Sequence, residues 1–336
     1  MSIILSQEEM WDRALGGNSD EKQIPHWFAN FAYGLVGGVF KVLFRYRVDG
    51  RENLRAFKDN CGAVVIANHT SFLDVAFMYI AARPSQFVRL MGRDSLFSNA
   101  GGLLGQILTR VGAFPIKRDS ADRAAIKRAA HMLKGNQLVG ILPEGTRRGK
   151  GSKTPELHSG AAFIAKMGKV PILPMTVRDA ENVKRKGERM RFPKITIEYG
   201  KPIVLSDFDF LPKDDRLEAC TWYAMREVFA LSQRIPADQV DMVALFPNGR
   251  DFSDVFAEHP NPEHSVEEAI ALTRPPKKAK AKKDAAGADV NTADGSRTAK
   301  AATATVAAAP ATEADTKAAD STSNQKPEGS AKPVAD

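Results

Sequence analysis

Residues 63–74 read AVVIANHTSFLD. The first five, Ala63 to Ala67, are all apolar and predict a buried strand. The stretch Val75 to Ile80 predicts a helix, so His69 lies where a strand gives way to a helix. Side chains at such a junction point out from the edge of a sheet. The sequence therefore predicts an α/β fold with a polar site at the end of this strand.

His69 and Asp74 are the candidate chemical groups at that junction. A turn at Thr70-Ser71 can bring the Asp74 carboxylate back to the imidazole. A carboxylate on one ring nitrogen fixes the tautomer and leaves the other nitrogen free to accept a proton. That is the arrangement of a general base. The alternative is structural, with Ser71 as a helix N-cap and Asp74 as an acidic residue in the first turn.

Composition limits the classes of protein to consider. The chain has 336 residues, 43% of them hydrophobic, which suits one or two domains with a real core. A net charge of +8 favours acidic partners, namely phospholipid head groups, nucleic acid or an acidic carrier protein. Cys61 and Cys220 have neither metal-binding nor redox spacing, so no disulfide is expected and a reducing compartment fits. The polar, acidic start of the chain does not have the pattern of a signal peptide.

Residues 1–50 are interpreted as an N-terminal helical, membrane-associating segment. Trp27 to Phe44 are mostly apolar or aromatic, at about the lower limit of length for a membrane span. Three glycines and Lys41 disfavour a span, and a cluster of arginines follows the stretch directly. Aromatic residues beside basic ones are typical of a helix lying in the head-group region of an anionic leaflet, which is preferred here over spanning. The alternative is a buried helix that covers the domain.

Residues 51–235 form the predicted catalytic domain, because apolar strands alternate with helical patterns along them. The expected strands are 63–67, 87–91, 113–116, 137–142, 170–177 and 194–199. The expected helices are 72–82, 101–110, 120–134, 157–167 and 214–233.

Residues 236–273 form a C-terminal extension whose structure the pattern does not predict, apart from a helix at 264–272. In residues 274–336, Arg274 is followed by two prolines and a lysine run, and the stretch contains no aromatic residue. Such a segment cannot bury enough surface to offset its ordering entropy, and we interpret it as a disordered tail. A solvated tether is favoured over binding to nucleic acid or to lipid.

Three further stretches of the chain are distinctive. Two contain groups suited to a phosphate or a tight turn, and the third is apolar. In Gly112 to Arg118, the planar guanidinium of Arg118 can donate two hydrogen bonds to a phosphate, and the ammonium of Lys117 can add a positive charge. In Leu142 to Arg148, Gly145 permits a tight turn, and the polar residues are Glu144, Thr146 and Arg147. Val170 to Met175 is an apolar strand framed by prolines, which suits an edge strand. Taken singly, the first two are ordinary strand ends with solvated charges or a salt bridge.

Together, in order, these four stretches resemble the four sequence blocks of the glycerolipid acyltransferase family, and most closely its bacterial lysophosphatidate acyltransferases. The resemblance covers about residues 25–235. It implies an α/β domain with a mostly parallel central sheet flanked by helices, preceded by a helical pair that seats it on the membrane. It also implies no metal and no cofactor, with acyl-CoA or acyl-carrier protein as co-substrate.

The resemblance also implies roles. His69 would take the proton from the free sn-2 hydroxyl of lysophosphatidate, and Asp74 would hold the imidazolium. The acceptor's phosphate and glycerol would be bound by residues of the second and third blocks: Lys117, Arg118, Glu144, Gly145, Thr146 and Arg147. Pro115, Lys117 and Arg148 depart from the common family pattern. They leave open whether the extra cations suit a different head group.

The function expected on this basis is synthesis of phosphatidate at the cytoplasmic face of the cell membrane. One alternative keeps the mechanism and changes the acceptor, to a lyso-ornithine lipid or another lysophospholipid. An alternative of another class is a non-catalytic protein that binds membrane or nucleic acid, although nucleic acid is disfavoured.

Overall fold

The structure is a computed structural model that describes residues 6–13, 15, 24, 26–83, 86–98, 102–117, 122–145, 147–148, 154–184 and 187–274. The chain divides into two units, residues 1–279 and 280–336. The tail predicted to be disordered lies outside the described residues from position 275 onward.

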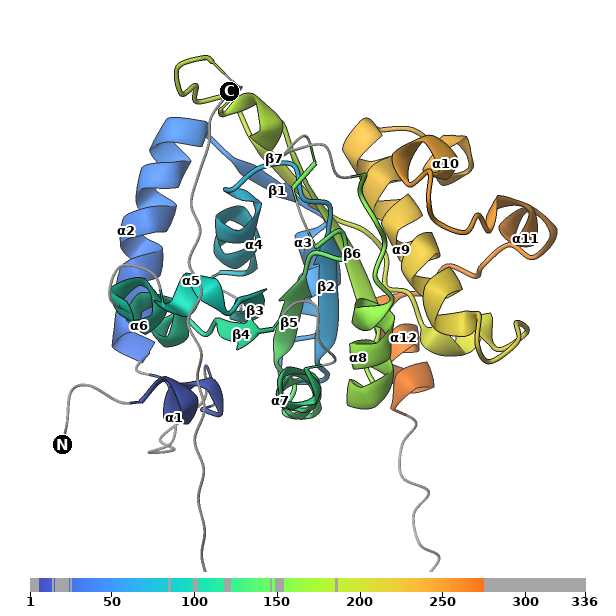
Figure 1. Cartoon of the computed structure of the whole chain (residues 1–336), viewed down its shortest axis with the longest axis horizontal. Coiled ribbons are helices and arrows are strands. Elements are labelled where there is room, and N and C mark those ends of the chain that lie inside the picture. Colours follow the sequence, from blue (N-terminus) through green and yellow to red (C-terminus); the bar gives the residue numbers. More distant parts are fainter. Residues whose placement is uncertain are drawn as a thin grey trace, which may run out of the picture. The chain divides into compact units, whose positions relative to one another are not determined.

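A single sheet organises the described part of the first unit (Figure 1). It has seven strands in the order β1-β7-β6-β2-β5-β3-β4. The strands are β1 (Arg47–Asp49), β2 (Ala63–Ala67), β3 (Val88–Arg93), β4 (Phe114–Ile116), β5 (Leu138–Ile141), β6 (Ile172–Arg178) and β7 (Thr196–Tyr199). All neighbouring pairs are parallel except β6 and β7. The predicted mostly parallel sheet is therefore confirmed.

The register of the strands determines which loops lie level with one another. Ile66 of β2 pairs with Ile141 of β5. On the far side of β5, Leu90 pairs with Gly140, and the next residue of β3, Met91, pairs with Phe114 of β4. The residues that follow β2, β5 and β4 therefore leave the sheet at the same edge and at a similar height. This edge carries all three polar stretches predicted from the sequence.

Helices cover both faces of the sheet. In Figure 1, α2 and α4 lie on one side of it, and α8 and α9 lie on the other. The described α-helices are α1 (Gln7–Trp11), α2 (His26–Phe44), α3 (Arg51–Arg55), α4 (Asp74–Ala82), α5 (Ser95–Ser98), α6 (Leu103–Arg110), α7 (Arg123–Lys134), α8 (Gly160–Gly168), α9 (Arg216–Gln233), α10 (Met242–Leu245), α11 (Ser253–Glu258) and α12 (Val266–Thr273). Short 3₁₀ turns occur at Ala180–Asn182, Leu205–Phe208 and Ala237–Gln239.

Helix α2 packs against the domain along one face only. The rings of its Phe40 and Phe44 lie 5.1 and 5.3 Å from that of Phe77 in α4. Its opposite face leaves large apolar side chains in contact with solvent: Trp27, Phe31, Leu35, Val39 and Val42. By length and composition α2 could cross a membrane. Helix α2 thus presents one face to its own domain and another to solvent.

The N-terminal segment is packed onto the sheet rather than extended away from it. Arg89 of β3 is fully buried and donates hydrogen bonds to the carbonyls of Trp11 and Arg13, at 2.7 and 2.6 Å. The indole ring of Trp11 also contacts Phe97 of α5 edge-on, with ring centroids 6.0 Å apart. Residues 6–13 therefore belong to the folded domain.

Two details differ from the sequence-based predictions. Arg47–Asp49 form β1 and pair with β7, so the sheet begins before residue 51. Three residues are too few to show an alternating pattern. The prolines of the fourth block suggested an edge strand, which is wrong, because β6 lies between β7 and β2. Pro174 is tolerated there because its missing N–H falls between the β7 ladder, which begins at Met175, and the isolated bridge from Ile172 to Ile203.

Candidate active site

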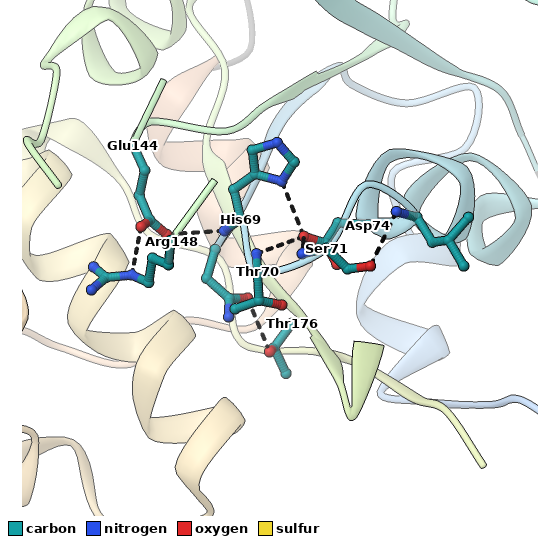
Figure 2. A network of polar contacts seen from close by, with 9 residues as sticks. His69, Thr70, Ser71, Asp74, Glu144, Arg148 and Thr176 are labelled. Atoms are coloured by element: carbon teal, nitrogen blue, oxygen red, sulfur yellow. Dashed lines mark hydrogen bonds and ion pairs between the residues drawn. The ribbon is translucent and has the colours of Figure 1, made fainter. Parts of the chain in front are cut away.

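The imidazole of His69 and the carboxylate of Asp74 are in contact at the end of β2. His69 Nδ1 lies 3.0 Å from Asp74 Oδ2. Figure 2 shows the second ring nitrogen turned away from Asp74, and Nε2 has no hydrogen-bond partner among the described residues. The contact predicted from the turn at Thr70-Ser71 is confirmed. The carboxylate can hold the Nδ1–H tautomer, which leaves Nε2 as a proton acceptor.

Asp74 also closes the turn that carries it. The same oxygen, Oδ2, accepts hydrogen bonds from the backbone N–H groups of Thr70 and Ser71, each at 2.7 Å. The residue is almost completely buried, and α4 begins with it. Ser71 does not act as the N-cap of α4, because its hydroxyl accepts from the nearby Leu73 N–H instead. The turn is therefore built around the carboxylate that orients His69.

Glu144 supports His69 from the neighbouring strand end. Its side chain is fully buried, and its Oε1 accepts the backbone N–H of His69 at 2.9 Å. Its Oε2 lies 2.5 Å from Nε of Arg148. Burial raises the pKa of Glu144, while Arg148 and the His69 N–H act in the opposite direction. The sequence predicted a contact between Glu144 and the acceptor, but both of its carboxylate oxygens face protein groups (Figure 2).

The two arginines after this turn are placed differently. Arg147 is half-buried, and its guanidinium makes no hydrogen bond or ion pair with the part of the chain that the structure describes. Arg148 instead pairs with Glu144, and its backbone N–H donates to the His69 carbonyl at 2.8 Å. That bond holds residues 147–148 beside the histidine. Arg147 is therefore an unengaged cation close to the predicted base.

The second block lies farther along the same edge. Lys117 follows β4, and its side chain is exposed, while its N–H donates to Asp122 Oδ2 at 3.0 Å. Because β5 and β3 separate β4 from β2, the two strands are about 14 Å apart by ordinary strand spacing. Arg147 is thus nearer to His69 than Lys117 is. Arg118 and Thr146, both predicted to bind substrate, lie outside the described residues.

Gly145 occupies the turn in a conformation that favours glycine. Its φ is +64°, and a Cβ at this position would lie 3.3 Å from the ring of His158. The role predicted for Gly145, permitting a tight turn, agrees with this backbone geometry.

Sequence reasoning missed two buried polar residues that hold the start of the motif. The amide oxygen of Asn68 accepts a hydrogen bond from the Thr176 hydroxyl of β6 at 3.2 Å. Both side chains are buried. The available signal was a polar residue inside the apolar strand β6, Thr176, and another directly after the apolar strand β2, Asn68, since buried polar groups are almost always paired.

Comparisons with known proteins identify the family of the chain. A family model described as Acyltransferase matches residues 45–178. A Bacillus subtilis protein is 32% identical over 207 residues, a match that spans 60% of this chain and 94% of the relative. The chain belongs to the acyltransferase family.

Two bacterial relatives are named for the same activity. The Bacillus subtilis protein is a 1-acyl-sn-glycerol-3-phosphate acyltransferase, as is a Streptococcus pneumoniae protein that is 33% identical over 43% of this chain and 51% of its own length. A crystal structure of the 1-acyl-sn-glycerophosphate (LPA) acyltransferase from Thermotoga maritima has a TM-score of 0.45 and 20% identity, and covers 60% of this chain and 79% of that one.

Proposed function

We propose that the protein transfers a fatty acyl group from an acyl thioester to the free sn-2 hydroxyl of lysophosphatidate, giving phosphatidate. The observation that carries the proposal is the 3.0 Å contact between His69 Nδ1 and the buried carboxylate of Asp74. It lies at the strand edge shared with a free cation, Arg147. The names of the similar Bacillus subtilis and Streptococcus pneumoniae proteins support this choice of acceptor.

In this proposal His69 is the general base. Nε2 takes the hydroxyl proton as the glycerol oxygen attacks the thioester carbonyl, and Asp74 stabilises the imidazolium that forms. When the tetrahedral intermediate collapses, the C–S bond breaks and the proton passes from Nε2 to the departing thiolate. The products are phosphatidate and a free thiol. General-base catalysis of this kind contributes about 10²–10⁴-fold to the rate.

The acceptor's phosphate is assigned to the basic residues at the same edge. Arg147 precedes the residue that is bonded to the His69 carbonyl, and its guanidinium has no partner among the described residues. A guanidinium can bind two phosphate oxygens at once. Lys117 and Arg118 would add charge from the end of β4, and Gly145 and Thr146 would line the glycerol. Glu144 is assigned to positioning His69, because its side chain is buried.

The acyl donor is proposed to be acyl-CoA or acyl-carrier protein, and the reaction requires no cofactor. The enzyme would work at the cytoplasmic face of the cell membrane, with α2 lying in the head-group region. The exposed Trp27, Phe31 and Leu35 are spaced four residues apart along one face of α2, which supports binding in the plane of the membrane.

Acceptor profiling tests the function. Wild-type protein with an acyl-CoA or an acyl-carrier protein is expected to acylate lysophosphatidate, with the product lipid identified by mass spectrometry. Arg147→Ala should raise the KM for lysophosphatidate by about 10–100-fold, since a charge-assisted bond is worth about 1.5–3 kcal/mol. The same variant should leave the slow reaction with monoacylglycerol, which has no phosphate, nearly unchanged.

Two outcomes would contradict the assignment. Preferential acylation of a lyso-ornithine lipid would replace lysophosphatidate as the acceptor while leaving the mechanism in place. Arg147→Ala with an unchanged KM would remove this residue from the phosphate site. Arg55 of α3, which lies outside the site, provides a charge-matched control as Arg55→Ala.

Membrane association is tested on α2. The double variant Phe31→Asp/Leu35→Asp should reduce co-sedimentation with vesicles of phosphatidylglycerol and phosphatidylcholine by at least about tenfold, since each apolar side chain that leaves the interface loses about 1.5–3 kcal/mol. Turnover of a detergent-dispersed acceptor should remain close to that of the wild type.

The matched control for this prediction places the same charges on another surface. Val243 of α10 and Leu272 of α12 are 53% and 50% exposed, comparable to Phe31 and Leu35 at 62% and 57%. Val243→Asp/Leu272→Asp should leave vesicle binding unchanged. Equal losses in the two double variants would mean that α2 is not the membrane-binding element.

A further inference from the structure

The C-terminal extension contacts the side chain of Arg148, at the candidate active site. Its guanidinium lies 4.7 Å from the ring centroid of Phe229 in α9 and 4.6 Å from that of Phe246, which follows α10. It also donates from Nη1 to the carbonyl of Leu245 at 3.2 Å. The sequence left open whether this unusual cation suits a particular head group. The structure shows that its charged group is committed to protein contacts.

The same guanidinium neutralises the carboxylate that supports His69. Glu144 Oε2 lies 2.5 Å from Arg148 Nε, and the carboxylate is fully buried. A buried carboxylate without a partner is costly, and removing one member of such a pair leaves the other charge uncompensated. Arg148 therefore favours the charged form of Glu144 and opposes the rise in pKa that burial causes.

Both backbone polar groups of His69 are bonded to this turn. Its N–H donates to Glu144 Oε1 at 2.9 Å, and its C=O accepts the N–H of Arg148 at 2.8 Å. The residue that carries the predicted base is thus held on its two sides by positions 144 and 148 (Figure 2). Displacement of residues 144–148 would displace the imidazole with them.

We propose that Arg148 is a positioning residue, through which α9 and the C-terminal extension fix the location of His69. The extension, residues 236–273, then contributes to the geometry of the active site. The path runs from the rings of Phe229 and Phe246 to Arg148, from Arg148 to Glu144, and from Glu144 to the His69 N–H. This inference rests on the proposed role of His69 as the base.

Arg148→Gln tests the inference, because glutamine removes the charge and the stacked guanidinium. We expect kcat to fall by about 10–100-fold with KM for both substrates changed less than about threefold, since a misplacement of about 1 Å at a reacting group can cost about 10²-fold. Arg148→Lys keeps the charge and should recover part of the loss. A change confined to KM would show that Arg148 binds substrate, and would overturn the proposal.

The matched control is Arg226→Gln. Arg226 of α9 has a side chain of similar exposure, 14% against 19% for Arg148. It lies over the rings of Trp222, Tyr223 and Phe256 and pairs with Glu227. Removal of the Arg226 guanidinium should lower the thermal stability. The kcat of Arg226→Gln should stay within about twofold of the wild-type value, which is small beside the 10–100-fold loss expected for Arg148→Gln. Equal kcat losses in the two variants would mean that Arg148 acts only through general stability.

The pH–rate profile provides a second readout. Burial already raises the pKa of Glu144, and Arg148 opposes that rise. Without the cation the carboxylate should take up a proton at a higher pH and lose its charge-assisted bond to His69. The acid limb of kcat should therefore move to higher pH in Arg148→Gln and should not move in Arg226→Gln. An unmoved acid limb in Arg148→Gln would contradict the proposed path.

A third readout does not depend on turnover. The amide proton of His69, bonded to a carboxylate in the wild type, should shift upfield in the NMR spectrum of Arg148→Gln. Phe246→Leu, which keeps the apolar volume but removes the ring, should produce a smaller shift in the same direction. If the wild-type protein fails to acylate lysophosphatidate, the proposed function fails, but these shifts still test the path. An unchanged His69 amide in folded Arg148→Gln would refute it.

Discussion

Replacing His69 with alanine is expected to lower kcat with lysophosphatidate by about 10²–10⁴-fold, the range contributed by a positioned general base. The variant loses Nε2, the nitrogen that faces away from Asp74 and is free to accept a proton. The fold should survive, because Glu144 and Arg148 bond to the backbone of His69 rather than to its ring. Initial rates, together with circular dichroism and a thermal unfolding curve, measure both parts of this prediction.

His131→Ala is the appropriate control for His69→Ala. His131 is an exposed residue of α7 and lies outside the site, so its removal should change neither rate nor stability. Turnover by His69→Ala within about threefold of the wild type would show that the reaction does not use this base, given the 10²-fold minimum expected of one.

Replacing Asp74 with asparagine is expected to be about as damaging to kcat, by about 10²–10⁴-fold, because loss of the buried charge removes the partner of the imidazolium and the group that fixes its tautomer. It should also destabilise the protein, unlike His69→Ala. Asp74 Oδ2 accepts two backbone N–H groups at 2.7 Å, and exchanging a charged acceptor for a neutral one weakens each bond by about 1 kcal/mol.

Measuring both quantities distinguishes the two roles of Asp74. The kcat of Asp74→Asn should be close to that of His69→Ala. The free energy of unfolding measured in urea should be lower for Asp74→Asn than for His69→Ala. The double variant should be no slower than the slower single variant, since residues that act as one unit are strongly non-additive. Additive losses of kcat in the double variant would show that the two side chains act independently. That result would contradict the joint action inferred from their 3.0 Å contact.

Much of the architecture could be predicted from local pattern. Apolar runs gave six of the strands, and the spacing from His69 to Asp74 gave the contact between them, because a turn of four residues involves only neighbours in the chain. The parallel register then brings the ends of β2, β5 and β4 to one edge, as alternating strands and helices predict.

Contacts between distant parts of the chain could not be predicted in this way. Arg148 looked like an additional cation for a head group, and only the fold shows that Phe229 and Phe246 enclose it. Glu144 was assigned to the acceptor on the resemblance to the family, yet its side chain is buried. The strand β1 was missed because three residues give no periodicity, and its pairing depends on β7, almost 150 positions later.

The order in which these contacts occur along the chain has a consequence for the protein as it is made. His69 and Asp74 are five positions apart, so the pair can form as soon as that short segment leaves the ribosome. The ring of Phe246 is translated much later, and until then Arg148 lacks one of the two faces that enclose it. A nascent chain thus contains His69 and Asp74 well before it contains the residues that hold them in place, and full activity should arise only after Phe246 has been made.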